Sequence, residues 1–329
     1  MNASGNLTGT KPFLKWAGGK TQLVPSIQAA LPKDLATTRD LTYVEPFVGG
    51  GAILFWLLTT YPNICRAVIN DLNPHLCQAY RTLQRQPKAL IQALRRIQQT
   101  YHALAQESDR RCYFEAMRTE YNEQTGTPLR HTVLLIFLNK TCFNGLYRVN
   151  RQGKFNVPHG RYHNPRICDP ATIQANSALL QRVTILNGDF SQTLAQVKGK
   201  SFFYLDPPYK PLSPTAQFNT YASEVFNDRS QERLAEFCQL LNREGHWWLL
   251  SNADVRNTDA DNAYFDDLYE GFTIRRICAR RTINCQSAKR GAISELLISN
   301  YAEPMGVSAA DTSSVLKSDG SRCHPRHSE

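Results

Sequence analysis

One short run of residues joins a buried strand to groups that could act on a substrate. Four apolar or aromatic residues, 202–205, lead directly into Asp206, Pro207, Pro208 and Tyr209. An apolar run that two prolines stop is typical of a central parallel strand that ends at the carboxyl edge of its sheet. Open α/β sheets bind their ligands at that edge. The run therefore predicts a catalytic site around Asp206.

These residue types suit methylation of the exocyclic amine of a nucleobase. The lone pair of such an amine is delocalised into the ring, and an enzyme must localise it without first removing a proton. The Asp206 carboxylate and the Pro207 carbonyl could each accept one N–H, and the prolines would hold both acceptors in place. Tyr209 could stack on a base that has left the duplex. Alone, the tetrapeptide also fits a turn in which Asp206 caps a helix, and it does not distinguish adenine from cytosine.

Two segments nearer the N-terminus predict a cofactor that contains a nucleoside. A short strand from Tyr43 runs into a turn of three glycines, 49–51, and then into an apolar helix. Glycines at such a turn let a helix N-terminus approach a ligand closely. A second strand, 67–70, ends in Asp71, where Rossmann-like folds bind ribose hydroxyls. Asp71 is also suited to cap the helix that begins near Asn73, and the two roles are compatible.

Another glycine turn, 18–19, lies between Trp16 and Lys20. It is not a P-loop, because that pattern needs a glycine five residues before the second glycine of the turn, where the chain has Leu14. The indole and the ammonium group that flank the turn could instead cover a cofactor that carries a carboxylate.

The charge of the chain is concentrated in residues 124–168, which contain seven Lys or Arg and no Asp or Glu. Aromatic residues and asparagines are interleaved with these cations, and the glycines and proline within 143–162 predict a hairpin with loops. A solvated surface usually mixes both signs of charge. Cations hold phosphates, whereas Asn, Arg and apolar side chains reach base edges. With a formal net charge of +10, this segment predicts a nucleic-acid partner.

The cysteines and the apolar runs exclude several classes of protein. The nine cysteines are scattered and none forms CxxC, which argues against a zinc ribbon or a disulfide framework and for a reducing compartment. We expect no metal ion. No apolar run is long enough to span a bilayer, and the N-terminus lacks an apolar signal segment. We therefore expect a cytoplasmic protein without a membrane partner.

An α/β fold must position these segments. Strands are predicted from Tyr43 and at 67–70, 183–186, 202–205, 247–252, 273–277 and 296–298, with a helix at about 231–244. This series predicts one doubly wound, Rossmann-like sheet. A helical stripe over 88–106 predicts the start of an inserted helical domain. We expect a disordered leader (1–10), a catalytic domain (11–82 and 181–301), an inserted helical and hairpin target-recognition domain (83–180) and a disordered tail (302–329).

Together the motifs resemble the Dam-type, D12 class of DNA adenine-N6 methyltransferases. The similar segments are 15–20, 45–51, 70–73 and 206–209. In the insert, 143–148 and 153–162 are similar to the hairpin of GATC-specific members. The resemblance covers about residues 11–301. It implies a Rossmann-like methyltransferase fold and S-adenosylmethionine as methyl donor.

The resemblance also implies roles for single residues. Asp71 would bind the ribose of the donor, 189–190 its adenine, and the expected donor-binding set is Trp16, Lys20, Phe47, Gly49, Gly51, Asp71, Asp189, Phe190 and Asp206. The expected DNA-binding set comprises base readers, a phosphate contact (Arg161) and a wedge (Phe143), and its members are Phe143, Asn144, Leu146, Arg148, Pro158 and Arg161. Many members carry tyrosine at the wedge. A loop at 280–290 is similar to a DNA-contacting loop of the family.

The leading hypothesis is therefore methyl transfer to adenine N6 in GATC of double-stranded DNA, with base flipping, by a monomer associated with the nucleoid. Methylation of another planar amine (cytosine N4, RNA adenine or protein glutamine) is a second hypothesis, although the basic insert argues against a protein substrate. A third is a non-catalytic DNA-binding relative. The presence of Lys20, Asp71 and Asp206 argues against it.

Overall fold

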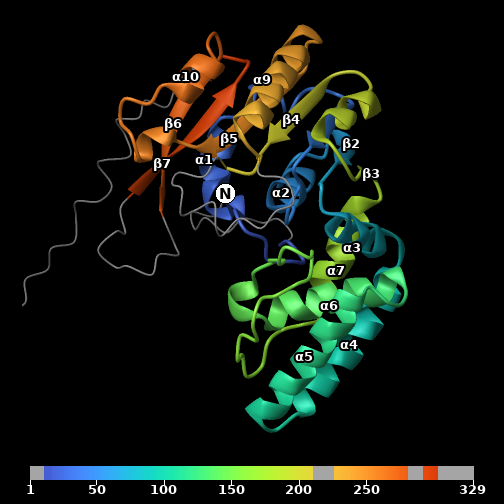
Figure 1. Ribbon diagram of the computed structural model, residues 1–329. Helices are drawn as coiled ribbons and strands as arrows, with labels where there is room; N and C mark the ends of the chain where they lie inside the picture. Colours follow the sequence, from blue (N-terminus) through green and yellow to red (C-terminus); the bar gives the residue numbers. More distant parts are fainter. Residues whose placement is uncertain (1–10, 210–225, 281–291, 303–329) are drawn as a thin grey trace, which may run out of the picture.

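The computed structural model describes residues 11–209, 226–280 and 292–302. A sheet occupies one half of the molecule, and a layer of helices lies below it in Figure 1. The predicted leader, residues 303–329 of the predicted tail and residues 281–290 of the family-like loop lie outside the described residues.

All seven predicted strands are present, and they confirm the doubly wound sheet. They are β1 (Leu41–Glu45), β2 (Ile64–Ile69), β3 (Val183–Ile185), β4 (Ser201–Leu205), β5 (Trp247–Ala253), β6 (Thr273–Arg280) and β7 (Ala292–Ser299). Their order is β3-β2-β1-β4-β5-β7-β6. The first five strands pair in parallel, whereas β7 is antiparallel to both of its neighbours, β5 and β6.

The helices lie on both faces of the sheet and in the inserted region. They are α1 (Val24–Ala29), α2 (Ala52–Thr60), α3 (Pro74–Arg85), α4 (Pro87–Ala103), α5 (Glu107–Glu123), α6 (Pro128–Thr141), α7 (Pro170–Leu180), α9 (Asp228–Arg243) and α10 (Tyr264–Leu268). Short 3₁₀ helices are η1 (Lys20–Leu23), η2 (Phe143–Gly145), η3 (Phe190–Gln196) and η4 (Val255–Asn257). Helices α4 and α9 confirm the helices predicted near 88–106 and 231–244.

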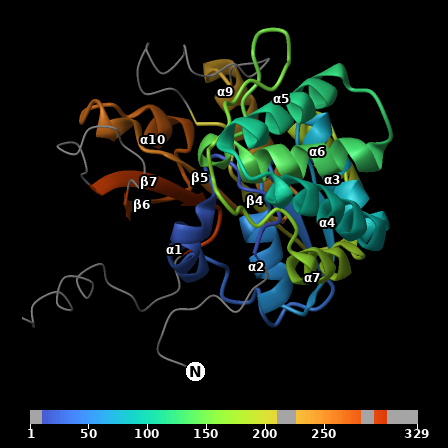
Figure 2. The same cartoon turned by 90° about the horizontal axis from the view of Figure 1, so that it is seen from below.

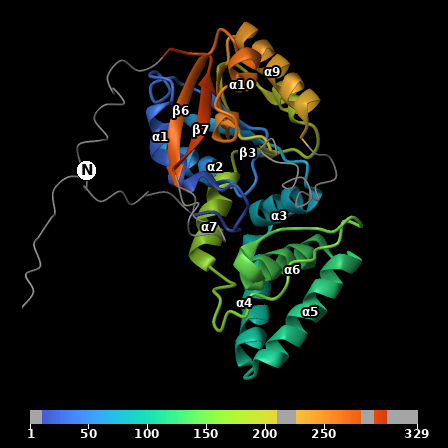
Figure 3. The same ribbon diagram turned by 60° about the vertical axis from the view of Figure 1, so that its left-hand side comes forward.

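The central strands are buried on both faces, as their apolar sequences require. Every residue of β1 and β4 is buried, and successive side chains alternate between two cores. Tyr43 packs in the core formed with α1, α2 and α7, whereas Val44 packs in the core formed with α9 and α10. Figure 3 shows these two groups of helices on opposite sides of the strands. The carboxyl ends of the parallel strands therefore open at one shared edge.

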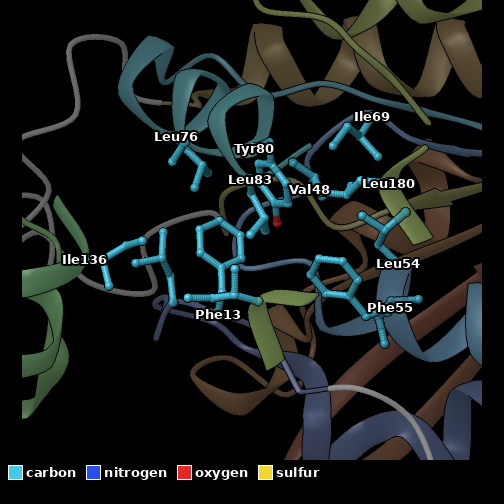
Figure 4. Packing of buried hydrophobic residues seen from close by; sticks show 14 of the residues in the cluster. Phe13, Val48, Leu54, Phe55, Ile69, Leu76, Tyr80, Leu83, Ile136 and Leu180 are labelled. Carbon is cyan, nitrogen blue, oxygen red and sulfur yellow. The ribbon is translucent and has the colours of Figure 1, made fainter. Parts of the chain in front are cut away.

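The inserted helices share their apolar core with the sheet domain. Phe13 lies among Tyr80, Leu83 and Ile136, which come from α3 and α6 (Figure 4). The Phe13 and Tyr80 rings meet edge to face, with centroids 5.2 Å apart. Helix α6 contacts α3, α4 and α5, and Figure 2 shows α4, α5 and α6 side by side. The inserted layer is thereby fixed directly to the helix that follows β2.

A stack of three rings lies where α3, α5 and α6 meet. The His131 ring lies 4.4 Å from that of Tyr121 and 4.8 Å from that of His75. Burial and, to a smaller extent, the neighbouring His75 lower the pKa of His131 to about 4. The His131 Nε2 and the Tyr121 hydroxyl are buried without a hydrogen-bond partner among the described residues. The stack therefore favours the neutral form of His131.

The predicted hairpin follows α6 and is confirmed. Val149 and Phe155 form an antiparallel bridge, and Cys142 forms another with His159. The Asn150 N–H donates to the Lys154 carbonyl at 2.8 Å, which closes the turn. These pairings are short, and neighbouring side chains also hold the segment: Asn122 of α5 forms hydrogen bonds with both the N–H and the carbonyl of Phe155.

Candidate active site

The glycine turn after β1 is shaped by close contact with α3. Gly51 has φ +74°, and a Cβ there would lie 2.5 Å from the Tyr80 hydroxyl oxygen. That hydroxyl donates to the Gly49 carbonyl at 2.9 Å. A side chain at Gly51 would therefore require both a strained backbone and a displaced tyrosine. The turn brings the N-terminus of α2 to the carboxyl edge of the sheet, as predicted.

Asp71 lies beside this turn and holds it. Its Oδ2 accepts from the Gly49 N–H at 3.1 Å, and its Oδ1 accepts from the Asn73 N–H at 2.9 Å. Burial raises the pKa of Asp71, and these two hydrogen bonds partly oppose that shift. The cap of α3 is Asn73, whose side chain accepts from the N–H groups of His75 and Leu76. Asp71 does not cap α3, and each of its oxygens keeps a second lone pair for a ligand.

Trp16 also lies against the glycine turn. A Cβ on Gly49 would come within 3.0 Å of the Trp16 ring, and one on Gly50 would come equally close to the Trp16 Cβ. The indole stacks on Tyr147 of the hairpin, with ring centroids 4.9 Å apart and planes 21° apart. The two residues predicted to bind a donor at this point, Trp16 and Gly49, are therefore neighbours.

Lys20 is placed at the end of β4 rather than in open solvent. Its side chain is 6% exposed, and Nζ lies 3.0 Å from Asp206 Oδ1. Nζ also donates to the Tyr209 hydroxyl and lies 4.2 Å from the centroid of its ring. The ammonium group thus joins the two side chains that sequence reasoning placed at the reacting base.

Asp206 has a second donor that sequence reasoning missed. The Ser251 hydroxyl, on β5, donates to Asp206 Oδ1 at 3.1 Å and bonds the Tyr204 hydroxyl at 2.9 Å. Burial raises the pKa of Asp206, and Lys20 and then Ser251 oppose that shift. Within the described part of the chain, both contacts end on Oδ1. Oδ2 is therefore the oxygen available to an incoming N–H.

Glu295 was also missed, because it lies in an ordinary strand pattern far along the chain. It belongs to β7, and its Oε2 accepts from the Tyr209 hydroxyl at 2.9 Å. Tyr209 is thereby fixed by an ammonium group on one side and a carboxylate on the other. Only the sheet order, in which β7 lies next to β5, could have revealed this contact.

The residues predicted to bind the adenine of a donor lie beyond β3. The rings of Phe47 and Phe190 are 5.4 Å apart. Asp189 Oδ1 accepts from Ser191, and Oδ2 pairs with Arg233 at 3.0 Å. Burial raises the pKa of Asp189, but these bonds outweigh it and the pKa is lowered overall. Arg233 lies 5.3 Å from the Phe190 ring centroid, so it supports both predicted residues.

The predicted DNA-binding residues share an exposed surface on the hairpin segment. Phe143 is 52% exposed and Leu146 is 36% exposed, unusual values for large apolar side chains. Asn144 has φ +56°, and its N–H donates to the Tyr162 hydroxyl. Arg148 donates through Nε to Asn156 Oδ1 at 2.8 Å. The guanidinium group of Arg148 is therefore oriented before any DNA is present.

The remaining two members of this set lie at the base of the hairpin. Pro158 is exposed, and its carbonyl accepts from the Phe143 N–H at 2.9 Å. Arg161 is 78% exposed and lies 3.9 Å from Glu107. The structure thus brings together all six predicted DNA-binding residues in one segment.

The charge of this region is less one-sided than its sequence suggests. Arg130 forms two 2.6 Å bonds with Glu120 of α5, and Arg166 pairs with Asp169 at 3.3 Å. Burial lowers the pKa of Lys140. Carboxylates outside 124–168 therefore neutralise part of the segment, and the exposed cations gather on the hairpin side.

Two negative observations concern the described residues alone. No helix there is long and apolar enough to cross a membrane. No group of three or more His, Cys, Asp or Glu side chains in 11–209, 226–280 or 292–302 could hold a metal ion.

Comparison with known proteins agrees with this site. The family model for D12 class N6 adenine-specific DNA methyltransferases matches residues 16–283. The chain is 44% identical to the type II methyltransferase M.MjaIII of Methanocaldococcus jannaschii, over 88% of this chain and 99% of that protein. It is 35% identical to the type II methyltransferase M1.LlaDCHI of Lactococcus lactis (90% and 97% covered). It is 34% identical to the DNA adenine methylase of Vibrio cholerae (87% and 95% covered).

The match spans the glycine turn, Asp71, the hairpin and Asp206. The chain belongs to the D12 class of N6 adenine-specific DNA methyltransferases.

Proposed function

We propose that this protein transfers a methyl group from S-adenosylmethionine to N6 of adenine in GATC sequences of duplex DNA, with the target base flipped out of the helix. The observation that carries the proposal is the Asp206 carboxylate, held through Oδ1 by Lys20 and Ser251 with Oδ2 available. It lies beside a glycine turn and a ribose-binding candidate, Asp71.

The residues present fit S-adenosylmethionine. Asp71 has one lone pair on each oxygen for the two ribose hydroxyls, since the turn and Asn73 use only one each. The absence of side chains on the glycine turn permits close approach to the donor. Phe47 and Phe190 offer aromatic surface at the adenine end, and Trp16 offers it near the turn. When bound, the donor supplies a sulfonium methyl group.

The residues at the end of β4 would act on the target amine. Asp206 Oδ2 and the Pro207 carbonyl would each accept one N–H, which draws the nitrogen lone pair out of the ring and toward the methyl group. After transfer, the positively charged nitrogen loses one proton. Asp206 is the adjacent base, and burial raises its pKa toward the range where it accepts a proton.

The depth of the site supports base flipping. The Asp206 side chain is only 19% exposed, so an adenine stacked in a duplex could not reach it. Tyr209, fixed by Lys20 and Glu295, would stack on the extruded base. Phe143, half exposed at the tip of η2, would fill the space that the base leaves.

The proposed GATC specificity rests on the hairpin. Arg148 is oriented by Asn156, and an arginine can bind guanine through two hydrogen bonds. Asn144, Leu146 and Pro158 are exposed beside it. The relative from Vibrio cholerae is named a DNA adenine methylase, which supports the choice of adenine.

The decisive test is methylation of a GATC duplex with labelled S-adenosylmethionine, followed by digestion to nucleosides. We expect label in N6-methyladenine and none in a duplex whose GATC is scrambled. The Asp206→Ala variant should lose transfer while it binds DNA almost unchanged, whereas Asp261→Ala, an exposed carboxylate on the far loop, should match the parent. Label in 4-methylcytosine, or none at all, would contradict the proposal.

We further propose that the protein acts as a monomer on nucleoid DNA in the cytoplasm, either as an orphan methyltransferase or as part of a restriction-modification system. Sedimentation at micromolar concentration tests the first point. A neighbouring gene for an endonuclease that cleaves the same sequence would support the last.

A further inference from the structure

The donor-binding segment and the base-reading segment contact each other directly at Trp16 and Tyr147. The Trp16 indole lies against the glycine turn and stacks on Tyr147 at 4.9 Å. Tyr147 stands between Leu146 and Arg148, two of the predicted base readers. The indole therefore connects the predicted donor site to the predicted base readers through one residue, Tyr147.

Asn139 of α6 joins the same two segments from below. Its Oδ1 accepts from the Lys15 N–H at 2.8 Å, and its Nδ2 donates to the Lys15 carbonyl at 2.9 Å and to the Gly145 carbonyl at 2.8 Å. The side chain is 1% exposed. The Asn139 amide thus donates one N–H to the segment that carries Trp16 and the other to the segment that carries Tyr147.

The two segments also pass at van der Waals distance. Gly145 has φ +65°, and a Cβ there would lie 2.5 Å from Lys15 Cδ and 3.1 Å from the Asn139 carbonyl oxygen. The hairpin itself contains two isolated bridges and a few further hydrogen bonds, and it forms no regular strand pair within the described residues. Its second half is anchored by the two hydrogen bonds between Phe155 and Asn122 of α5, whereas the part that carries Leu146 and Arg148 is held beside the donor-binding segment by the contacts with Trp16 and Asn139.

We propose that Tyr147 and Asn139 are positioning residues that couple the methyl-donor site to the base-reading hairpin. This inference rests on the proposed function. A donor bound against Trp16 restricts the indole, and the restricted indole holds Tyr147 and with it the backbone of Leu146 and Arg148. Whichever ligand binds first restricts these side chains, so the second ligand loses less conformational entropy and binds more tightly. The enhancement must be equal in both directions.

The experiment measures this coupling factor in the full-length protein. Calorimetric titration gives the Kd of S-adenosylhomocysteine, which cannot react, with and without a saturating GATC duplex. We expect a ratio of about 5–150 in the parent, the usual range for coupled sites. The ratio should fall to near 1 in Tyr147→Ala and should be retained in Tyr147→Phe, which keeps the ring.

A merely structural role for Tyr147 would weaken folding without changing the ratio, so the unfolding midpoint of each variant in urea is measured in parallel. Emission of Trp16, obtained by subtracting the spectrum of Trp16→Phe, reports whether the stack is lost in Tyr147→Ala. Asn139→Ala removes the three hydrogen bonds of a buried side chain and is expected to fold poorly. The test is therefore made with the Tyr147 variants.

Three results would overturn the coupling. They are a ratio of 1 in the parent, an unchanged ratio in Tyr147→Ala, and a ratio lost equally in Tyr147→Phe. Failure of the proposed function looks different, because the parent would then bind neither S-adenosylhomocysteine nor the duplex, or would methylate no adenine. Loss of both binding events rejects both proposals, whereas a coupling ratio above 1 without methylated adenine rejects the proposed function alone.

Discussion

Replacement of Lys20 by methionine tests how the buried carboxylate of Asp206, the proposed catalytic group, is kept charged. Lys20 Nζ lies 3.0 Å from Asp206 Oδ1, and the lysine side chain is 6% exposed. Two unit charges at this distance attract each other by about 5–6 kcal/mol at an effective dielectric constant of about 20. Desolvation offsets part of that attraction, and removal of one partner from a buried pair typically costs about 3–5 kcal/mol. We expect a loss of that size for Lys20→Met at neutral pH.

The loss should depend on pH with a definite sign. Burial already raises the pKa of Asp206, and the variant removes the first group that opposes this shift. A carboxyl whose folded-state pKa exceeds its unfolded value binds more protons when folded, so stability falls as the pH rises from the unfolded value to the folded one. The deficit of Lys20→Met should thus be smallest in acid and largest at neutral and higher pH.

Urea unfolding of four proteins measures this directly: the parent, Lys20→Met, Asp206→Asn and the double variant. If the deficit comes from an unpaired buried charge, adding Asp206→Asn to Lys20→Met should restore most of the stability. A deficit that is the same at every pH, or a double variant no more stable than Lys20→Met, would refute the reasoning. Because the measurement concerns folding, any role of Lys20 in donor binding does not enter it.

Three further predictions concern other residues. Glu295→Ala should lower kcat about 2–10-fold, because the hydrogen bond that holds Tyr209 contributes about 0.5–1.5 kcal/mol. Glu295→Gln keeps an acceptor and should retain most activity; equal losses in both would show that the charge, not the acceptor, matters. Arg148→Ala should reduce the difference in binding free energy between GATC and duplexes with one base pair of the site changed by about 1–3 kcal/mol, measured by filter binding. An equal loss of affinity for all of these duplexes would instead identify Arg148 as a phosphate contact. Because the pKa of His131 is lowered to about 4, the parent should lose stability as the pH falls from about 6.5 toward 4. Urea unfolding at a series of pH values should show a smaller dependence of stability on pH in His131→Phe, and an unchanged dependence would assign the titration to another group.

The sheet was predictable because each strand has a local signature. The strand from Tyr43 is a buried run before glycines, and the run that ends at Asp206 is stopped by prolines. Both deliver polar groups to the carboxyl edge, and the parallel pairing of β1 with β2 and β4 brings Asp71 and Asp206 to either side of the glycine turn. Local pattern and the rule for open sheets are sufficient for that part of the site.

Contacts between distant segments could not be predicted in the same way. Ser251 and Glu295 reach the site because β5 and β7 are neighbours, and strand order is a property of the whole sheet. Asn139 lies in an apolar helix where nothing marks it, and its three hydrogen bonds depend on how α6 meets the N-terminal segment. The charge count of the insert was misleading for the same reason, because the partner of Arg130 lies on α5.

The position of β7 between β5 and β6 has a consequence for the order in which the enzyme is assembled. During synthesis, the strands that carry Asp71 and Asp206 leave the ribosome well before Glu295 does. β6 does not pair with β5 in the finished sheet, so it can join only through the strand made after it. The carboxylate that fixes Tyr209 therefore arrives with the strand that closes the sheet. A nascent chain that holds only β1–β5 would still lack the acceptor that fixes the Tyr209 hydroxyl.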